Sequence, residues 1–482
     1  MRFLSRKHTL LTGATLAGAL VLAGCDNDDP LAQLRVIHAS SDAPPVNVFV
    51  DSANPVSGLD YADSSGFVNV VAGTRDIVVQ AIRPEPLADL SVITVNGLTL
   101  SEGSQTTVMA IDDTATIREQ VIAGSASEPT SSEVAISVVH ASPDPAAANV
   151  DVYITDATTA LTGITPDFNF DFTDEQDVGA VAAGTYRIRV TGAGSKTPAY
   201  DSGPVDLTPF AGQSLVIAAV NTVNSVTSDA SPIKLMAYTD SAQVELLDTG
   251  TLTAAKVVHL SSDAGTVAAG PVEVFATSTL LTPNPTELIP AFSYLDVEPA
   301  VNDYVDVPVD ATTRTGDYVF SVAADGTGIG SAVFTSDTQT LAAGGEATVI
   351  AAGYVGMTPS FDLLVTADNN RSVATQASVK VVHGAPSAGT VDVYVTPTGD
   401  FTVTEVEMGM ATPLLPDFTY GTITDYVAVA PGDYDIRVVA GGTAAINVEG
   451  FTLGAGLVAT VIAREPDGDG TPSDFGLVVL TN

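Results

Sequence analysis

Four histidines, each followed four residues later by a carboxylate or a hydroxyl, are the side chains of this chain best suited to chemistry. The pairs are His38 with Asp42, His140 with Asp144, His259 with Asp263, and His383 with Ser387. A histidine beside a carboxylate can act as a general base or as part of a metal site. The alternative is a structural role, in which a half-buried histidine ends a strand and is tied to a turn that Asp or Ser caps.

We favour the structural interpretation of these histidines for two reasons. Ser387 can replace Asp as a turn cap, but it cannot replace it as the carboxylate partner of a base. Each region also supplies only one histidine, whereas zinc needs three or four ligands. Nucleophilic catalysis has little support, because the chain has no Gly-x-Ser-x-Gly motif. We therefore predict no catalytic residues and no firm metal site.

Calcium remains an open alternative at one loop near the end of the chain. Asp467, Asp469 and Asp474 lie close together among glycines. Closely spaced carboxylates can surround a hard cation, but this loop lacks the full calcium-binding pattern of an EF-hand. Asp-Gly is also a common hairpin turn. The sequence therefore gives only a weak calcium candidate, and we expect no cofactor.

The histidines mark four copies of one segment. These copies are Leu34–Asp51, Ile136–Thr155, Lys256–Ala276 and Val379–Thr396. Further along each repeat, a Gly-x-Tyr step precedes a strand at Tyr186, Tyr318 and Tyr434, where the first repeat carries Arg75. Internal periodicity of this length indicates tandem domains. It predicts repeats at 34–130, 131–250, 251–374 and 375–482, joined by short polar segments that leave open whether the repeats pack together.

The elements that must position these residues are β-strands. Apolar and polar residues alternate over short runs rich in Val, Ile, Tyr and Thr, and Gly, Pro, Asp and Asn separate the runs. Such spacing predicts tandem immunoglobulin-like antiparallel β-sandwiches. The Gly-x-Tyr step is similar to a tyrosine corner, in which the phenol hydrogen-bonds a backbone group where the chain crosses between sheets.

The repeated motifs resemble a known bacterial and archaeal family. Val138–Ile154 carries the V-V-H-x-S-P-D and V-D-V-Y signature best, and the later G-x-Y-x-I-R-V and L-x-x-G strings accompany it. Together they resemble the domain of unknown function 4397, in four copies that cover nearly all of the chain after residue 33. The fourth copy departs by placing Ala385 and Ser387 where Ser and Asp are usual. The resemblance implies a secreted or envelope β domain, often lipid-anchored, and no established reaction.

The first 24 residues are expected to be a signal peptide. Arg2, Arg6 and Lys7 form a basic head, and an uncharged apolar stretch follows that is too short to span a bilayer. The stretch ends in Leu-Ala-Gly before Cys25, the only cysteine in the chain, and resembles a bacterial lipobox. We expect lipid attachment at Cys25, a polar linker at 25–33, and an extracytoplasmic protein anchored to a cell membrane. Asp26 resembles an inner-membrane retention signal, but the choice between inner and outer membrane stays open.

Charge narrows the classes of partner. The 482 residues carry 17 Lys and Arg against 57 Asp and Glu, for a net charge of −40. Nucleic-acid binding needs a basic surface, so we exclude it. We expect a non-enzymatic, lipid-anchored envelope protein that acts as a spacer, an adhesin or a ligand-binding module, with an envelope protein or a polysaccharide as its ligand. The alternatives are a polysaccharide-acting enzyme or its accessory binding subunit, and a calcium-rigidified stalk.

Overall fold

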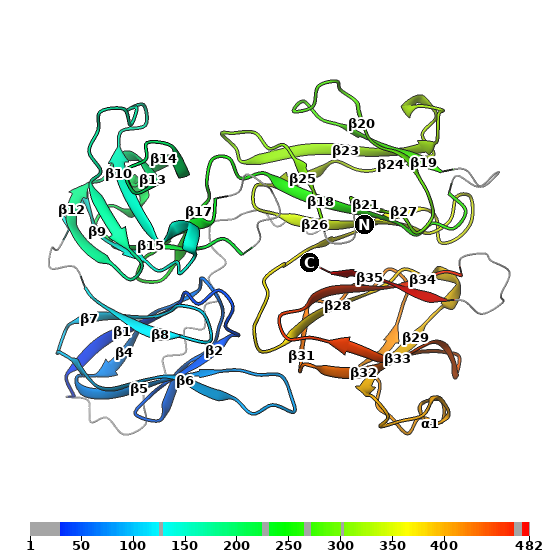
Figure 1. The fold of residues 1–482 in the computed structure, drawn as a ribbon, viewed down its shortest axis with the longest axis horizontal. Helices are drawn as coiled ribbons and strands as arrows, with labels where there is room; N and C mark the ends of the chain where they lie inside the picture. Colours follow the sequence, from blue (N-terminus) through cyan, green and yellow to red (C-terminus); the bar gives the residue numbers. More distant parts are fainter. Residues whose placement is uncertain are drawn as a thin grey trace. The chain divides into compact units, whose positions relative to one another are not determined.

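The protein is an all-β chain of sandwich-like repeats (Figure 1). A computed structural model describes residues 29–124, 129–223, 231–264, 271–299, 303–466 and 475–481. The predicted signal peptide and Cys25 lie outside the described residues, as do Asp467, Asp469 and Asp474. Within the described part, no helix is long and apolar enough to cross a membrane.

Each repeat contains eight or more strands in two sheets. The first repeat has β1 Leu31–His38, β2 Val46–Val50, β3 Ala53–Leu59, β4 Ser64–Val71, β5 Gly73–Ala81, β6 Leu90–Leu100, β7 Gln105–Ile111 and β8 Arg118–Ala123. The second has β9 Glu133–His140, β10 Asn149–Thr155, β11 Phe168–Asp171, β12 Glu175–Ala182, β13 Thr185–Gly192, β14 Pro198–Asp206, β15 Ser214–Asn221, β16 Ile233–Tyr238 and β17 Gln243–Leu246.

The third and fourth repeats follow the same plan. The third has β18 Thr253–His259, β19 Val272–Thr277, β20 Thr286–Phe292, β21 Val297–Glu298, β22 Val305–Val307, β23 Thr315–Ala324, β24 Phe334–Thr335, β25 Gln339–Ala342, β26 Glu346–Ala352 and β27 Asp362–Ala367. The fourth has β28 Ala377–His383, β29 Val391–Pro397, the short helix α1 Val403–Glu407, β30 Leu415–Phe418, β31 Val427–Val429, β32 Gly432–Ala440, β33 Thr443–Leu453, β34 Val458–Arg464 and β35 Gly476–Thr481.

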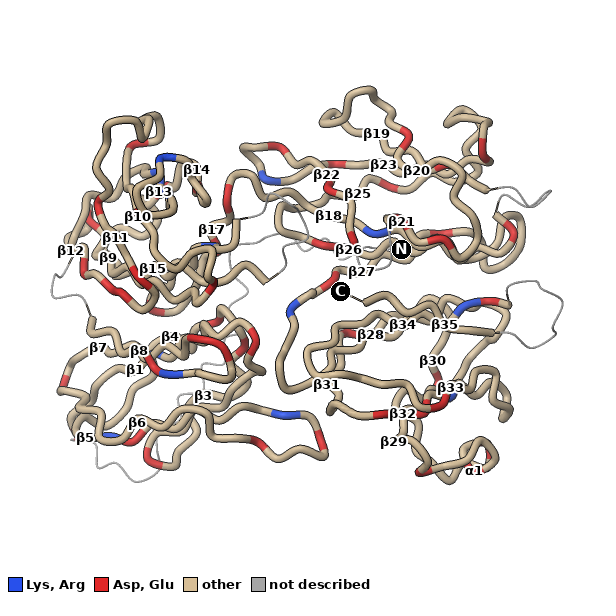
Figure 2. The backbone as a smooth tube through the Cα atoms, in the orientation of Figure 1, with Lys and Arg blue, Asp and Glu red and all other residues tan. Residues whose placement is uncertain are grey.

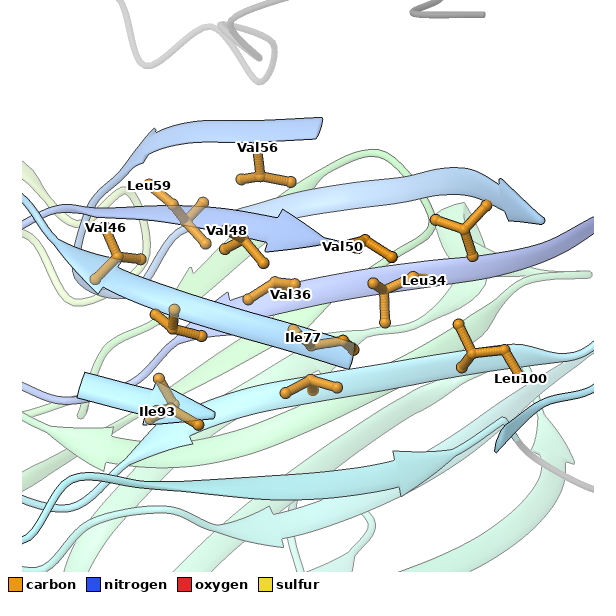
Figure 3. Close-up of a cluster of buried hydrophobic side chains, with 14 of the residues drawn as sticks. Leu34, Val36, Val46, Val48, Val50, Val56, Leu59, Ile77, Ile93 and Leu100 are labelled. Carbon is orange, nitrogen blue, oxygen red and sulfur yellow. The ribbon is translucent and has the colours of Figure 1, made fainter. Parts of the chain in front are cut away.

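Within a repeat, the chain passes back and forth between the two sheets. In the first repeat, the inner sheet has the order β4-β1-β7-β8 and the outer sheet the order β3-β2-β5-β6. We use "inner sheet" for the one that holds β1, β9, β18 or β28, and "outer sheet" for the one that holds β2, β10, β19 or β29. Alternate residues of the facing strands, such as Leu34, Val36, Val46 and Val48, meet between the sheets and are fully buried (Figure 3). Period-two alternation therefore builds the core of each repeat.

The prediction of purely antiparallel sheets is wrong in one respect. The first strand of every repeat pairs in parallel with the seventh-strand equivalent, as β1 with β7, β9 with β15, β18 with β26 and β28 with β34. The inner sheets are therefore mixed. Parallel neighbours need a long connection between them, and here the whole outer sheet supplies it. Periodicity within one strand carries no information about the direction of its neighbour.

Inner sheets are buried on both faces, because repeats pack in pairs. Repeats one and two form one compact unit, and repeats three and four form a second. In the first unit, Ile37 and Met109 of one inner sheet pack with Val139 and Ala218 of the other. In the second unit, Val258, Ile350, Val382 and Ile462 make the equivalent cluster. Each unit thus stacks four sheets, with an apolar layer between each repeat's sheets and another between the repeats.

The register explains why neighbouring repeats lie side by side within a unit. Gln33 at the start of β1 pairs with Gln105 at the start of β7, and Ala123 at the end of β8 pairs with Thr106. The chain therefore enters and leaves the first repeat at the same end of the inner sheet. A short connection from there leads directly into β9, whose sheet packs against the one just completed.

Candidate functional site

The site built from the recurring residues is the loop that follows the first strand of each repeat. All four histidines end that strand, and each lies beside an alanine of the parallel neighbour, at Ala110, Ala219, Ala351 and Ala463. The residue two positions before each histidine faces the sandwich interior, and the histidine shares that face. The histidines are 0–1% exposed. The prediction of half-buried histidines therefore understates their burial.

The ring nitrogens of these histidines form hydrogen bonds with backbone groups of the loop that follows the strand. Nε2 donates to the carbonyl oxygen of Pro44 from His38 (3.0 Å), of Ala147 from His140 (2.6 Å) and of Gly389 from His383 (2.8 Å). Nδ1 accepts from the backbone N–H two residues later at His259 and His383, both at 3.3 Å. A ring that donates through one nitrogen and accepts through the other, as His383 does, is neutral. It clamps the strand end to the loop.

Burial favours the neutral form of three of these rings. It lowers the pKa of His140 and His383, although the hydrogen bonds to Ala147 and Gly389 oppose the shift. It lowers the pKa of His259 to about 4. A buried imidazole whose two nitrogens both meet backbone groups, as in His383, has no free lone pair for a metal or a substrate.

The acidic residues of the same loop reach across to the loop after the seventh strand. Asp42 Oδ1 accepts from the backbone N–H of Thr114 at 2.7 Å and from its hydroxyl at 2.9 Å. Asp263 Oδ1 accepts from the N–H of Val355 at 2.9 Å. Asp144 instead caps the short 3-10 turn at Pro145–Ala147, where it accepts from Ala146 N–H. These carboxylate hydrogen bonds hold loops together.

The fourth repeat makes the same connection with the carboxylate on the other loop. Ser387 donates to Glu465 through its backbone N–H at 2.6 Å and through its hydroxyl at 2.5 Å. Glu465 is 5% exposed and directly follows β34. Glu465 was not among the predicted residues, because only the parallel pairing of β28 and β34 brings it beside Ser387. Two features of the sequence could have indicated this contact. Position 387 lacks the Asp of the other repeats, and a Glu follows two residues after Ala463, the residue that pairs with His383.

The tyrosines of the Gly-x-Tyr step hydrogen-bond the backbone where the chain crosses between sheets. Tyr186 and Tyr434 donate to the carbonyl oxygens of Ala182 and Ala430, four residues earlier, at 2.8 Å in both cases. Tyr318 donates to Pro308 across a longer turn. These contacts close the crossing from an inner-sheet strand to an outer-sheet strand.

In the first repeat, Arg75 replaces the tyrosine and makes the equivalent contact. Its Nε donates to Val71 O, again four residues earlier, at 2.7 Å, and a second guanidinium nitrogen donates to Ala72 O at 2.9 Å. The guanidinium also pairs with Asp51 at 2.8 Å. One backbone position is thus capped in every repeat, by two chemically different side chains.

Two further features bear on chemistry at this site. Among the described residues, no group of three or more His, Cys, Asp or Glu side chains is placed to hold a metal ion. Ser231 and Lys234 have the Ser-x-x-Lys spacing found in some serine enzymes. Lys234 Nζ, however, binds Glu245 at 2.5 Å, and the Ser231 hydroxyl accepts from the N–H of Ile233. This serine and lysine are therefore occupied with other partners.

The surface is acidic and offers no aromatic platform. Asp and Glu are spread along both units, whereas Lys and Arg are few (Figure 2). The chain has no Trp, and every Tyr and Phe in the described ranges is buried or half-buried. A ligand that meets the described surface therefore finds no flat exposed ring on which to stack.

Comparison with known proteins identifies the domain without assigning a role. A family model for a domain of unknown function (DUF4397) matches residues 32–153 and 282–394, so a DUF4397 domain is present in these two regions. No curated protein matches the chain. A solved structure on alpha-glucan recognition by family 41 carbohydrate-binding modules of streptococcal virulence factors is similar at 13% identity, over 48% of this chain and 96% of that one, with a TM-score of 0.13.

A second solved structure is the product complex of SpuA, a glycogen-degrading pneumococcal virulence factor. It is similar at 10% identity, over 66% of this chain and 37% of that one, with a TM-score of 0.13. Similarity at this level carries no argument about function.

Proposed function

Given DUF4397 domains in two regions of the chain, we propose that all four repeats are immunoglobulin-like copies of this domain in a non-enzymatic, lipid-anchored envelope protein. The protein holds a binding surface away from a bacterial membrane, as a spacer, an adhesin or a ligand-binding module. Cys25 is the acylated residue, and residues 1–24 are the signal peptide that precedes it. The ligand is an envelope protein or a polysaccharide.

One observation carries the non-enzymatic part of the proposal. The residue types that recur in the repeats are occupied in holding the backbone. The histidines clamp the strand end, the carboxylates tie two loops together, and the tyrosines or Arg75 cap the crossing. Residues used in this way specify a rigid scaffold, and rigid sandwiches present ligands with their variable loops.

Anchoring is tested by cell fractionation of the full chain in a Gram-negative host. We expect the chain to sediment with membranes, to incorporate labelled palmitate and to be released by detergent. Cys25→Ser is the matched variant, because it removes the only thiol and changes no described residue. Equal membrane association of the two forms would refute lipid attachment at Cys25.

Binding and catalysis are separated by incubating the chain without residues 1–25 with a panel of envelope polysaccharides and envelope proteins. We expect saturable retention of at least one member of the panel and no release of new reducing ends. Time-dependent release of reducing ends would favour the rival, a polysaccharide-acting enzyme. Calcium is added to one arm at millimolar concentration, because the calcium-stalk alternative predicts that a chelator lowers the melting temperature.

A further inference from the structure

The second repeat contains an apolar cavity between its inner and outer sheets. Its volume is about 240 Å³, and its walls are mainly Val, Ile, Leu and Phe side chains, among them Val138, Val152, Ile188 and Ile217. A cavity of about 150 Å³ lined by such residues already stays dry and admits benzene. The cavity is thus large enough for a small ligand.

Polar groups at the wall of the cavity are already in use. Tyr186 donates to Ala182 O, His140 Nε2 donates to Ala147 O, and Asp167 accepts from the backbone N–H of Ile154 at 2.7 Å. One buried side-chain atom of the wall, His140 Nδ1, has no hydrogen-bond partner. A buried water needs two to four polar partners, so the cavity favours an apolar occupant over water.

The wall of the cavity reaches the edge of the sandwich formed by β11 and β12, the edge strands of the two sheets. The half-buried wall residues Phe168, Val178 and Val181 belong to these two edge strands. Asp167, which is exposed, precedes β11 at the same edge. A carboxylate here, on a chain of net charge −40, disfavours an anionic ligand and leaves a neutral one unaffected.

The fourth repeat provides an internal comparison, because its equivalent space is largely filled. The cavity there has a volume of only about 50 Å³. Phe451 lines it and pairs with Tyr434 in the register in which Val205 pairs with Tyr186 in the second repeat. A phenyl ring in one repeat thus corresponds to an isopropyl group in the other.

Two more positions change in the same direction. Leu414 of the fourth repeat donates its N–H to Val393 O as Asp167 does to Val152 O, so these two residues are equivalent. Val427 pairs with Val379 where Gly179 pairs with Ile136. All three differences give the second repeat a smaller or more polar residue. The change is not uniform along the wall, because Phe168, which pairs with Val152, is larger than its equivalent Leu415, which pairs with Val393.

We propose that the cavity of the second repeat is a binding site for a small, neutral, apolar molecule, which enters between β11 and β12. This inference goes beyond the proposed function and holds whether or not the chain is anchored or binds a polysaccharide. The probe is 1-octanol, with octanoate as the charged comparator of equal chain length. We expect saturable binding of octanol with one site per chain, and binding of octanoate at least about tenfold weaker.

Val205→Phe is the decisive variant, because it installs the residue that lines the filled cavity of the fourth repeat. We expect it to weaken octanol binding at least about tenfold, since even one methylene of excess volume in an apolar pocket changes affinity by about that factor. Phe451→Val is the matched control. It makes the reverse change in the fourth repeat and leaves the affinity of the second-repeat site unchanged.

Titration calorimetry of the chain without residues 1–25, which keeps every described residue, measures both affinities. Circular dichroism checks that the variants fold. If Val205→Phe does not fold, methyl NMR of the unchanged chain decides the question, because octanol must shift the methyl signals of Ile136, Ile188 and Ile217 ahead of those of the fourth repeat. Absence of saturable binding, binding equal in Val205→Phe, or octanoate binding as tight as octanol would overturn the proposal.

Discussion

At the scale of single residues, the repeats keep the position of a contact while changing the chemistry that makes it. At the crossing between sheets, the carbonyl oxygen four residues before the capping side chain accepts from a phenol in two repeats and from a guanidinium in the first. The carboxylate that ties the two loops is Asp42 in the first repeat and Glu465, on the opposite loop, in the fourth. Such exchanges indicate that backbone geometry, and not a reaction, constrains these positions.

Arg75 gives the first prediction. Arg75→Ala removes two hydrogen bonds to half-buried carbonyl groups and should lower the free energy of unfolding by about 1–3 kcal/mol. Arg75→Tyr should recover most of that loss, because a tyrosine at this position caps the same carbonyl in other repeats. Urea denaturation measures both variants. A tyrosine variant as unstable as the alanine variant would argue against the equivalence of the two caps.

The buried histidines give a pH dependence. Burial lowers the pKa of His140 and His383, and lowers that of His259 to about 4, whereas an unfolded histidine titrates near pH 6.5. Between these values the unfolded chain binds protons that the folded chain does not. For His259 the stabilisation is therefore complete above pH 6.5 and is lost as the pH falls towards 4, by on the order of 1 kcal/mol per pH unit. His140 and His383 act in the same direction.

Urea denaturation at pH 7.5 and 5.5 measures this loss, with His259→Asn as its control. Partial protonation of the acidic surface relieves repulsion and acts in the opposite direction. The difference between the two pH slopes isolates His259, and we expect a shallower slope for the variant. Identical slopes would mean that the ring does not stay neutral in the folded protein.

Many of the residues that hold the loops could be predicted from the sequence, since spacing alone located the histidines, the tyrosines and the acidic positions. The hydrogen-bond partners of these residues could not be predicted. Thr114, Val355 and Glu465 follow the seventh strand of their repeats, far along the chain, and meet the first loop only through the parallel pairing. The cavity was also beyond prediction, because it depends on the summed volumes of side chains from both sheets.

At the scale of elements, the sequence predicted the strands. It did not predict that the strands of the inner sheets are buried on both faces. The first strand of each repeat carries two consecutive apolar residues before its histidine, such as Val138-Val139 and Val381-Val382. A strand with one solvated face would alternate there, whereas an uninterrupted apolar run is typical of a strand covered on both faces. In the structure Val138 packs within its repeat, and Val139 packs against the neighbouring repeat.

The interface in the second unit holds a buried ion pair that gives a prediction at this scale. Lys380 Nζ of β28 lies 3.2 Å from Asp368 Oδ1, which directly follows β27 of the third repeat, and both side chains are at most 3% exposed. Burial lowers the pKa of Lys380, and the charge of Asp368 opposes that shift. Asp368 also accepts from Thr348 and Tyr304.

Asp368→Asn leaves the Lys380 ammonium buried without its counter-charge. We expect the free energy of unfolding to fall by about 3–5 kcal/mol. Glu245→Gln is the control, because its partner pair with Lys234 has an exposed carboxylate and should contribute less than about 1 kcal/mol. Thermal and urea unfolding of both variants measure the contrast, and equal losses would show that burial of the pair does not matter.

At the scale of the molecule, the unit of structure is two repeats. Within each pair the inner sheets cover one another, and in the first pair hydrogen bonds such as Arg35 to Thr239 O and Tyr61 to Asn221 O cross the contact. The sequence located the repeats but not this pairing. The signal for the pairing is the second apolar residue of the doublet before each histidine, such as Val139, which lies on the face that a single sandwich would leave open.

Dissection of the chain tests the pairing. Residues 29–251 and 252–482 should each fold as monomers with cooperative melting, since neither cut opens an apolar layer. Residues 375–482 alone would expose Val382, Ile462 and Leu480, and should self-associate or melt at a lower temperature. Sedimentation velocity and calorimetry distinguish these outcomes. A monomeric single repeat as stable as its pair would contradict the two-repeat unit.

The apolar doublet before each histidine also constrains how such a chain can lengthen over evolutionary time. A duplication that adds one repeat leaves the inner sheet of that repeat exposed, with Val and Ile facing water. A duplication that adds two repeats lets their two inner sheets pack against each other. Arrays of this architecture should therefore grow and shrink by twos, and a natural homologue with an odd number of repeats should carry polar residues at one of the two doublet positions in its unpaired member.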